Sequence, residues 1–109
     1  MAKKWIIQDG NLRLGHVDLH KELKSKTGNA VKGGGYWELD KEKKIIYLYG
    51  KSIDFGQCKL DDIINARNDG YAGPTLEEMD WVFSNHLTLG ECFDNGTLIK
   101  SNYESEEDK

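Results

Sequence analysis

The sequence predicts an α+β fold, on three observations. Short β-prone runs separated by turn residues fill the first half of the chain, residues 59–67 carry apolar side chains at helical spacing, and the residues around position 81 alternate between apolar and polar. With 109 residues the chain has room for one core. We therefore expect a single domain over residues 1–103, followed by an acidic, disordered tail over residues 104–109.

A first hairpin is predicted at the N-terminus. Trp5-Ile6-Ile7 is a β-prone run, and the turn residues Asp9-Gly10-Asn11 follow it directly. Leu12 and Leu14 continue the apolar pattern on the returning strand. Two antiparallel strands therefore open the chain.

A short helix is predicted next, over residues 19–27. Leu19 and Leu23 are spaced four apart, as they would be on one face of a helix. Asp18 can act as the N-cap, and Gly28 is a stop signal.

The second predicted hairpin consists of strands at residues 33–40 and 44–49, joined by a polar turn. The second of these strands is apolar at nearly every position, which indicates a central strand covered on both faces. The first begins with Gly33-Gly34-Gly35, a run that is entropically costly to order. These glycines indicate a positive φ or a very close approach to another part of the molecule.

Residues 59–67 are the surest helix. Leu60, Ile63 and Ile64 recur at i, i+3 and i+4, two acidic residues lie near the start, and Arg67 lies at the end. This order of charges suits the helix dipole.

Two patterns compete between residues 75 and 84. A threonine and a glutamate three positions later have the form of a capping box, whereas the apolar residues that follow alternate with polar ones as in a strand. We expect a single helical turn over residues 75–78 and a strand over residues 79–84. Residues 97–99 are expected to add an edge strand.

Composition limits the possible functions. The net charge is −4, of which the tail carries −3, so the body is nearly neutral and has no basic stripe for nucleic acid. Cys58 and Cys92 lack CxxC spacing, which argues against a disulfide scaffold and favours a reducing, cytoplasmic location. No apolar stretch approaches the roughly 20 residues that cross a bilayer.

The histidines are the first candidates for chemistry. His16 and His20 are four apart, but the predicted boundary between strand and helix separates them and no third zinc ligand is evident. A single histidine is usually a partly exposed polar residue. Its ordinary pKa near 6.5 nevertheless suits proton transfer or acceptance of a phosphoryl group.

Residues that could hold a phosphate are also present. Lys4, Arg13 and Lys51 offer positive charge, Ser52 offers a hydroxyl, and the glycine-flanked loop over residues 50–56 offers main-chain amides. Each also has a simpler interpretation, since surface lysines and turn serines are common.

The motifs together resemble those of the Janus/Ocnus family, which includes the eukaryotic protein histidine phosphatases. The resemblance is strongest over residues 33–56, with the triple glycine, a polar turn and the sequence from Tyr49-Gly50 to Gly56. Upstream, Val17 to Leu23 is similar to the family segment that carries the catalytic histidine. The resemblance assigns that role to His20, with His16 as the alternative.

The resemblance implies a mixed sheet of five or six strands with a helix on each face. It also implies a protein that hydrolyses or binds phosphohistidine or a related phosphorylated group, without metal or cofactor. Its partner would be a phosphorylated protein or a small phosphorylated ligand. The phosphate-binding residues it implies are Lys4, Arg13, Gly35, Ser52, Ile53, Asp54 and Gly56.

The sequence also departs from the family pattern. Tyr36 follows the triple glycine where the eukaryotic enzymes have an arginine, so a charge-assisted contact to phosphate is lost. The segment between His20 and the glycines is also shorter than in those enzymes. The alternative interpretation is a non-catalytic binding module, in which Tyr36 and three exposed aromatic residues, Trp37, Tyr71 and Trp81, recognise an anionic ligand or a protein.

Overall fold

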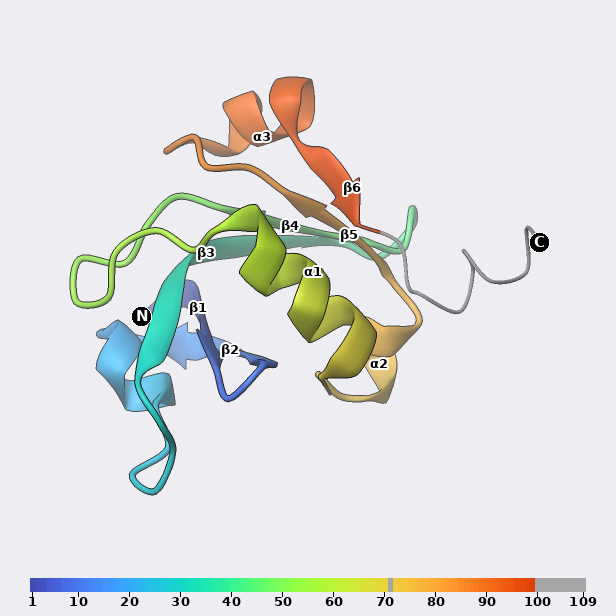
Figure 1. Cartoon of the computed structure of the whole chain (residues 1–109). Helices are drawn as coiled ribbons and strands as arrows, with labels where there is room; N and C mark the ends of the chain where they lie inside the picture. Colours follow the sequence, from blue (N-terminus) through green and yellow to red (C-terminus); the bar gives the residue numbers. More distant parts are fainter. Residues whose placement is uncertain (71, 100–109) are drawn as a thin grey trace.

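The computed structural model describes residues 1–70 and 72–99, and over these residues it forms one six-stranded mixed sheet with helices on both faces (Figure 1). The strand order is β2-β1-β3-β4-β5-β6, and only β4 and β5 are parallel neighbours. In chain order the elements are β1 (Ala2–Gln8), β2 (Asn11–Val17), the 3-10 helix η1 (His20–Leu23), β3 (Val31–Asp40), β4 (Ile45–Tyr49), α1 (Leu60–Asp69), α2 (Pro74–Glu77), β5 (Asp80–Phe83), α3 (Leu89–Asn95) and β6 (Thr97–Ile99). The predicted α+β fold is confirmed.

Both predicted hairpins are present. Asp9 and Gly10 form the first turn with φ of 54° and 75°, the left-handed pair that a two-residue hairpin turn requires. The second hairpin joins β3 to β4, and β4 lies between β3 and β5, which confirms that it is a central strand.

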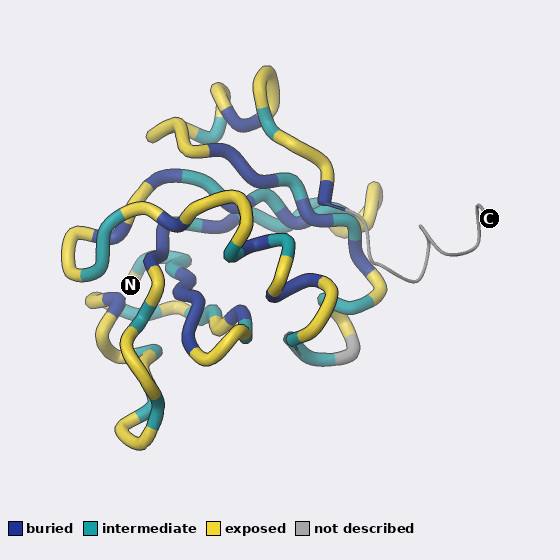
Figure 2. The backbone as a smooth tube through the Cα atoms, in the orientation of Figure 1, coloured by how far each residue is buried: buried dark blue, intermediate teal, exposed yellow. Residues whose placement is uncertain are grey.

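The hydrophobic core lies on the face of the sheet that α1 crosses. Alternate residues of the strands point to this face and meet Ile63 and Ala66 of α1. Figure 2 shows the buried residues concentrated along the strands and on the inner side of this helix. The strand residues that form the core include Trp5, Ile7, Trp37, Ile46, Leu48, Trp81 and Phe83.

The expectation of exposed tryptophans is wrong. Trp37 is 8% exposed and Trp81 is fully buried, because both point to the core face. Their indole N–H groups are also satisfied internally, by the Lys4 carbonyl for Trp37 and by the Leu76 carbonyl for Trp81. Tyr71 lies outside the described residues.

The second face of the sheet is covered at two separate places. η1 packs over β1 and β2 at one end, where Leu23 lies against Gly15. α3 covers β4 and β5 at the other, where Phe93 contacts the ring of Tyr47 at a centroid distance of 4.8 Å. In the strand order, β3 lies between the strands that these two helices cover.

The predicted helix over residues 19–27 is wrong in its extent, because only His20–Leu23 is helical. From Ser25 onward the main chain is bound by the buried side chain of Gln8. The Gln8 carboxamide accepts from the Ser25 N–H at 2.8 Å and donates to the Asn29 carbonyl at 2.8 Å. This anchor competes with helical hydrogen bonding and ends the helix early.

In the second half, α1, the helical turn α2 and the strands β5 and β6 confirm the predictions to within two residues. The helix α3 was not predicted. The tail over residues 104–109 lies outside the described residues. Among the described residues, no helix has the length and apolar character needed to span a bilayer.

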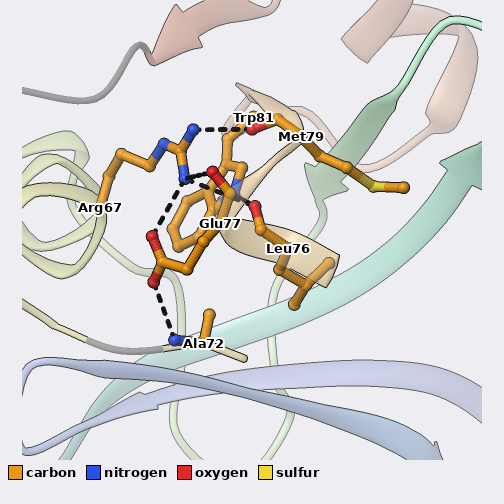
Figure 3. A network of polar contacts seen from close by, with 6 residues as sticks. All are labelled: Arg67, Ala72, Leu76, Glu77, Met79 and Trp81. Carbon is orange, nitrogen blue, oxygen red and sulfur yellow. Dashed lines mark hydrogen bonds and ion pairs between the residues drawn. The ribbon is translucent and has the colours of Figure 1, made fainter. Parts of the chain in front are cut away.

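A buried arginine joins α1, α2 and β5 (Figure 3). Arg67 donates to the carbonyls of Leu76, Glu77 and Met79, and it contacts the Glu77 carboxylate at 3.5 Å. Its guanidinium also lies over the ring of Trp81, 5.0 Å from the ring centroid. We call this set of contacts the Arg67 clamp.

Candidate functional site

His20 is the centre of the candidate site. It is the first residue of η1, and only 2% of it is exposed. Its Nε2 lies 2.7 Å from the Gly35 carbonyl oxygen, and its ring meets the ring of Tyr36 edge to face at 5.6 Å. The histidine is therefore held against the glycine run of β3.

The glycine run makes this contact possible. A Cβ at Gly34 would collide with the Trp5 carbonyl and would lie 3.3 Å from Cδ2 of His20. A Cβ at Gly35 would collide with the Tyr49 carbonyl. The expectation of a very close backbone approach at the triple glycine is thus met on both neighbouring strands.

The Gly35 carbonyl decides which nitrogen of His20 carries the proton. A carbonyl only accepts hydrogen bonds, so Nε2 must be the donor, and Nδ1 of the neutral ring keeps its lone pair. Within the described residues Nδ1 has no hydrogen-bond partner. Among these residues, Arg67 Nε is the one side-chain nitrogen or oxygen that is sealed from solvent without a partner, so Nδ1 of His20 keeps some contact with solvent.

Burial lowers the pKa of His20 below its ordinary value of 6.5, and the positive charge of Lys4 adds to this effect. The hydrogen bond to Gly35 and the negative charge of Asp54 act in the opposite direction, but the net shift is downward. The imidazole is consequently neutral at pH 7.

Lys4 lies beside this histidine. It pairs with Tyr36 of β3 and with Gly15 of β2, so its side chain is on the face that η1 covers. Its Nζ donates to the carbonyl of Asp18, two residues before His20. The positive charge of Lys4 is therefore held next to the start of η1.

The loop over residues 50–56 is attached to the same part of β3. The Ser52 N–H donates to the Gly34 carbonyl at 3.0 Å, the Gly56 N–H donates to the Ser52 carbonyl at 2.8 Å, and Ser52 Oγ accepts from the Phe55 N–H at 3.1 Å. These internal bonds occupy the amides of Ser52 and Gly56. They shape the loop rather than face a ligand.

Two other amides of the loop are available. In the described part of the chain, the N–H groups of Ile53 and Asp54 have no hydrogen-bond partner, and Ile53 is 91% exposed. The negative charge of Asp54 acts on the pKa of His20, so the Asp54 carboxylate is within electrostatic range of the imidazole. Of the loop residues that the resemblance implicated, Ile53 and Asp54 offer free donors.

Arg13 is bound to the last residue of η1, Leu23, and is not among the charges that shift the pKa of His20. Its Nε donates to the Leu23 carbonyl at 2.7 Å, and its side chain lines a cavity of about 380 Å³ at the outer edge of β2, together with Ala72 and Leu76. The charges that act on His20 are those of Lys4 and Asp54.

The other two histidines also lie elsewhere. His16 pairs with Lys3, one position out of phase with Lys4, so it points to the opposite face, where its ring meets Trp37 at 5.3 Å. His86 follows β5 and pairs through Nδ1 with Glu91 at 3.2 Å.

Tyr49 is a neighbour of the site that the sequence analysis did not single out. It pairs with Tyr36, and the two rings lie 6.1 Å apart. Because Lys4 pairs with Tyr36 in turn, the three side chains form a row on one face. The alternation of apolar and polar residues predicts which side chains of one strand share a face. It shows which side chains of neighbouring strands lie side by side only once the register is known.

The described residues contain no cluster of three His, Cys, Asp or Glu side chains arranged as a metal site. Cys58 and Cys92 are unpaired and buried, and burial raises their pKa to about 12 and about 11. Neither thiol is suited to act as a nucleophile.

Comparison with known families gives a match. The model of the Janus/Ocnus family matches residues 6–72. The chain belongs to the Janus/Ocnus family. The matched segment runs from the middle of β1 to just beyond α1, so it includes His20, the glycine run and the Ser52 loop, and it leaves out Lys4 and everything from α2 onward. No curated protein and no solved structure matches the chain.

Proposed function

We propose that this Janus/Ocnus protein binds a phosphorylated group at His20 and hydrolyses it, with phosphohistidine as the substrate class. One observation carries the proposal: the Nε2–H group of a buried histidine donates a hydrogen bond to the Gly35 carbonyl, which leaves Nδ1 as a free base, and Lys4 lies nearby. A nucleophile or general base for phosphoryl transfer needs such a lone pair.

Two routes use this nitrogen. In one, Nδ1 of His20 attacks phosphorus while the bond from phosphorus to the leaving nitrogen breaks, and water then hydrolyses the phosphorylated histidine. In the other, Nδ1 takes a proton from water as that water attacks phosphorus, the bond from phosphorus to the leaving nitrogen breaks, and the leaving imidazole takes up a proton. Both require a neutral imidazole, which the lowered pKa of His20 supplies at pH 7.

The surrounding donors would stabilise the charge of the phosphoryl group. Lys4 supplies a positive charge, and the free amides of Ile53 and Asp54 can donate to phosphoryl oxygens. Donors fixed in place before the reaction are the main source of stabilisation in phosphoryl transfer.

A second candidate function is a binding module that holds an anionic group or a protein partner without catalysis. Two observations favour it. Tyr36 occupies the position where the eukaryotic enzymes of the family have an arginine, and Arg13 lies at the edge of β2 rather than beside His20. Fewer cations would then face the phosphate, which lowers affinity and transition-state stabilisation together.

The proposal extends to partner and location. The ligand is a phosphorylated protein or a small phosphorylated molecule, and the location is the cytoplasm. Two unpaired, buried cysteines support a reducing compartment.

The test is hydrolysis of a phosphohistidine peptide by the wild type, His20→Ala and His16→Ala. We expect His20→Ala to lose at least about 100-fold in rate, because it removes the base or nucleophile, and His16→Ala to keep the wild-type rate. Acid-labile phosphate on the protein after rapid quenching would indicate the route through phosphorylated His20. A wild type that binds inorganic phosphate but releases none from the peptide would instead support the binding module, and equal rates in all three proteins would exclude both histidines.

A further inference from the structure

The segment that follows β5, Ser84 to His86, contacts both ends of the loop that carries the free amides. The Gly50 N–H, at the start of the loop, donates to the His86 carbonyl at 2.8 Å. The Gln57 side chain, just beyond its end, donates through Nε2 to the Asn85 carbonyl at 2.8 Å. Two successive carbonyls of one segment therefore hold the two ends of one loop.

The position of this segment is itself well determined. The Ser84 N–H donates to the Leu48 carbonyl at 2.9 Å, which extends the pairing of β4 with β5 by one step. Ser84 is buried, and its Oγ accepts from the His86 N–H at 3.0 Å. His86 then pairs with Glu91 in the first turn of α3.

The loop has little freedom where the segment binds it. Gly50 has φ of 76°, which favours glycine, and a Cβ there would lie 2.9 Å from Cδ2 of Tyr36. Between its ends the loop is fixed to Gly34 by the Ser52 N–H. Between these three attachments the tip of the loop, Ile53 and Asp54, is exposed to solvent.

We infer that Ser84 to His86 is a positioning segment for the phosphate site: its carbonyls, through Gly50 and Gln57, hold the Ile53 and Asp54 amides where they can meet a phosphate bound at His20. This inference rests on the proposed function. It gives a role in the site to a part of the chain that lies beyond the residues matched by the family model. Gln57 is a positioning residue in this inference, since it acts through the Asn85 carbonyl.

The experiment compares Gln57→Met, which keeps the length of the side chain but loses the donor, with Gln57→Arg, which restores a donor. Asn85→Ala is the matched control, because the segment uses the carbonyl of Asn85 and not its side chain. Ser84→Ala tests the attachment at the start of the loop, where Gly50 binds His86, because it removes the acceptor of the His86 N–H. Two NMR readouts are used: hydrogen exchange of the Ser52 and Gly56 amides, and the shifts of the Ile53 and Asp54 amides during titration with inorganic phosphate.

We expect Gln57→Met and Ser84→Ala to speed exchange at Ser52 and Gly56 by about 2- to 10-fold, the effect of one lost hydrogen bond, and to weaken phosphate binding by a similar factor. Gln57→Arg should restore both readouts, and Asn85→Ala should change neither. Unchanged exchange in both Gln57→Met and Ser84→Ala would overturn the inference, and so would faster exchange with undiminished phosphate affinity. If the Ile53 and Asp54 amides of the wild type show no response to phosphate, both the proposed phosphate site and this inference are refuted. If the wild type responds and the variants behave like it, only the positioning role is refuted.

Discussion

His20 and Arg67 are both buried, basic side chains that donate to main-chain carbonyls, yet they belong to two different regions of the molecule. His20 lies on the face of the sheet that η1 covers, and it binds one carbonyl, that of Gly35. Arg67 lies on the face of the sheet that α1 crosses, and it contacts three carbonyls, the Glu77 carboxylate and the ring of Trp81.

The difference follows from the chemistry of the two groups. An imidazole can lose its charge when it is buried, so one acceptor suffices and the second nitrogen stays free for a ligand. A guanidinium remains charged at any ordinary pH and must be surrounded by acceptors. The His20 region is therefore suited to chemistry, and the Arg67 clamp is suited to joining α1, α2 and β5.

The largest expected effect is on the clamp. Arg67→Met should lower the free energy of unfolding by about 2–4 kcal/mol, because several buried carbonyls and the Glu77 carboxylate lose a charged donor. Urea unfolding followed by tryptophan fluorescence measures it. Lys3→Met, which removes a partly exposed ion pair with Glu38, is the control and should cost under about 1 kcal/mol. Similar losses in the two variants would contradict the comparison.

The next effect concerns the site and not stability. Tyr36→Arg should tighten binding of inorganic phosphate by about tenfold, because it adds a charged donor beside His20. Isothermal titration calorimetry provides the measurement, and Tyr36→Met separates the added charge from the lost ring. An affinity that does not change would mean that position 36 does not face the phosphate.

A smaller effect should come from the carboxylate of the clamp. Glu77→Gln should cost about 0.5–1.5 kcal/mol, since the amide oxygen can still accept from Arg67 or from the Ala72 N–H, and the three carbonyls still bind the guanidinium. Urea unfolding again gives the value. A loss as large as that of Arg67→Met would show that the carboxylate, and not the carbonyls, neutralises Arg67.

The subtlest test uses pH. The pKa of His20 is lowered in the folded protein, so below pH 6.5 the unfolded chain takes up this proton more readily than the folded one. His20 should therefore make the protein less stable as pH falls through and below 6.5, and should have no such effect above that range. The difference in unfolding free energy between wild type and His20→Gln should shift in favour of the variant on acidification. A difference that stays constant between pH 7.5 and 5.5 would refute the lowered pKa, and His16→Gln, a change at an exposed histidine, is the control.

Periodic patterns were enough to predict most of the fold. The hairpin turn at Asp9-Gly10, the spacing of Leu60, Ile63 and Ile64, and the alternation before Phe83 are local signals, and each gave the right element. The missed helix α3 had a local signal as well. Thr88 caps it and accepts from the Glu91 N–H, and Leu89, Cys92 and Phe93 recur at i, i+3 and i+4, but the helix spans only the seven residues Leu89–Asn95.

The site was less predictable because it depends on register. The family resemblance indicated His20, but the contact of its Nε2 with Gly35 joins residues 15 apart, and no local pattern specifies it. The family resemblance placed Arg13 among the phosphate-binding residues. In the structure its Nε donates to the Leu23 carbonyl, a contact between two segments that no local pattern specifies. Whether the expected phosphate residues bind phosphate stays a prediction.

The parallel pairing of β4 with β5 also has a consequence for the order in which the protein folds. The first four strands associate through antiparallel neighbours, and β1, β3 and η1 already bring His20 to Gly35. β5 can pair with β4 only after the connection that contains α1 has brought the two strands together. Closing this long connection costs more conformational entropy than forming a hairpin, so the pairing is slower. During synthesis the imidazole would reach its pocket first, and the loop at Gly50 would be fixed only when the last third of the chain arrives.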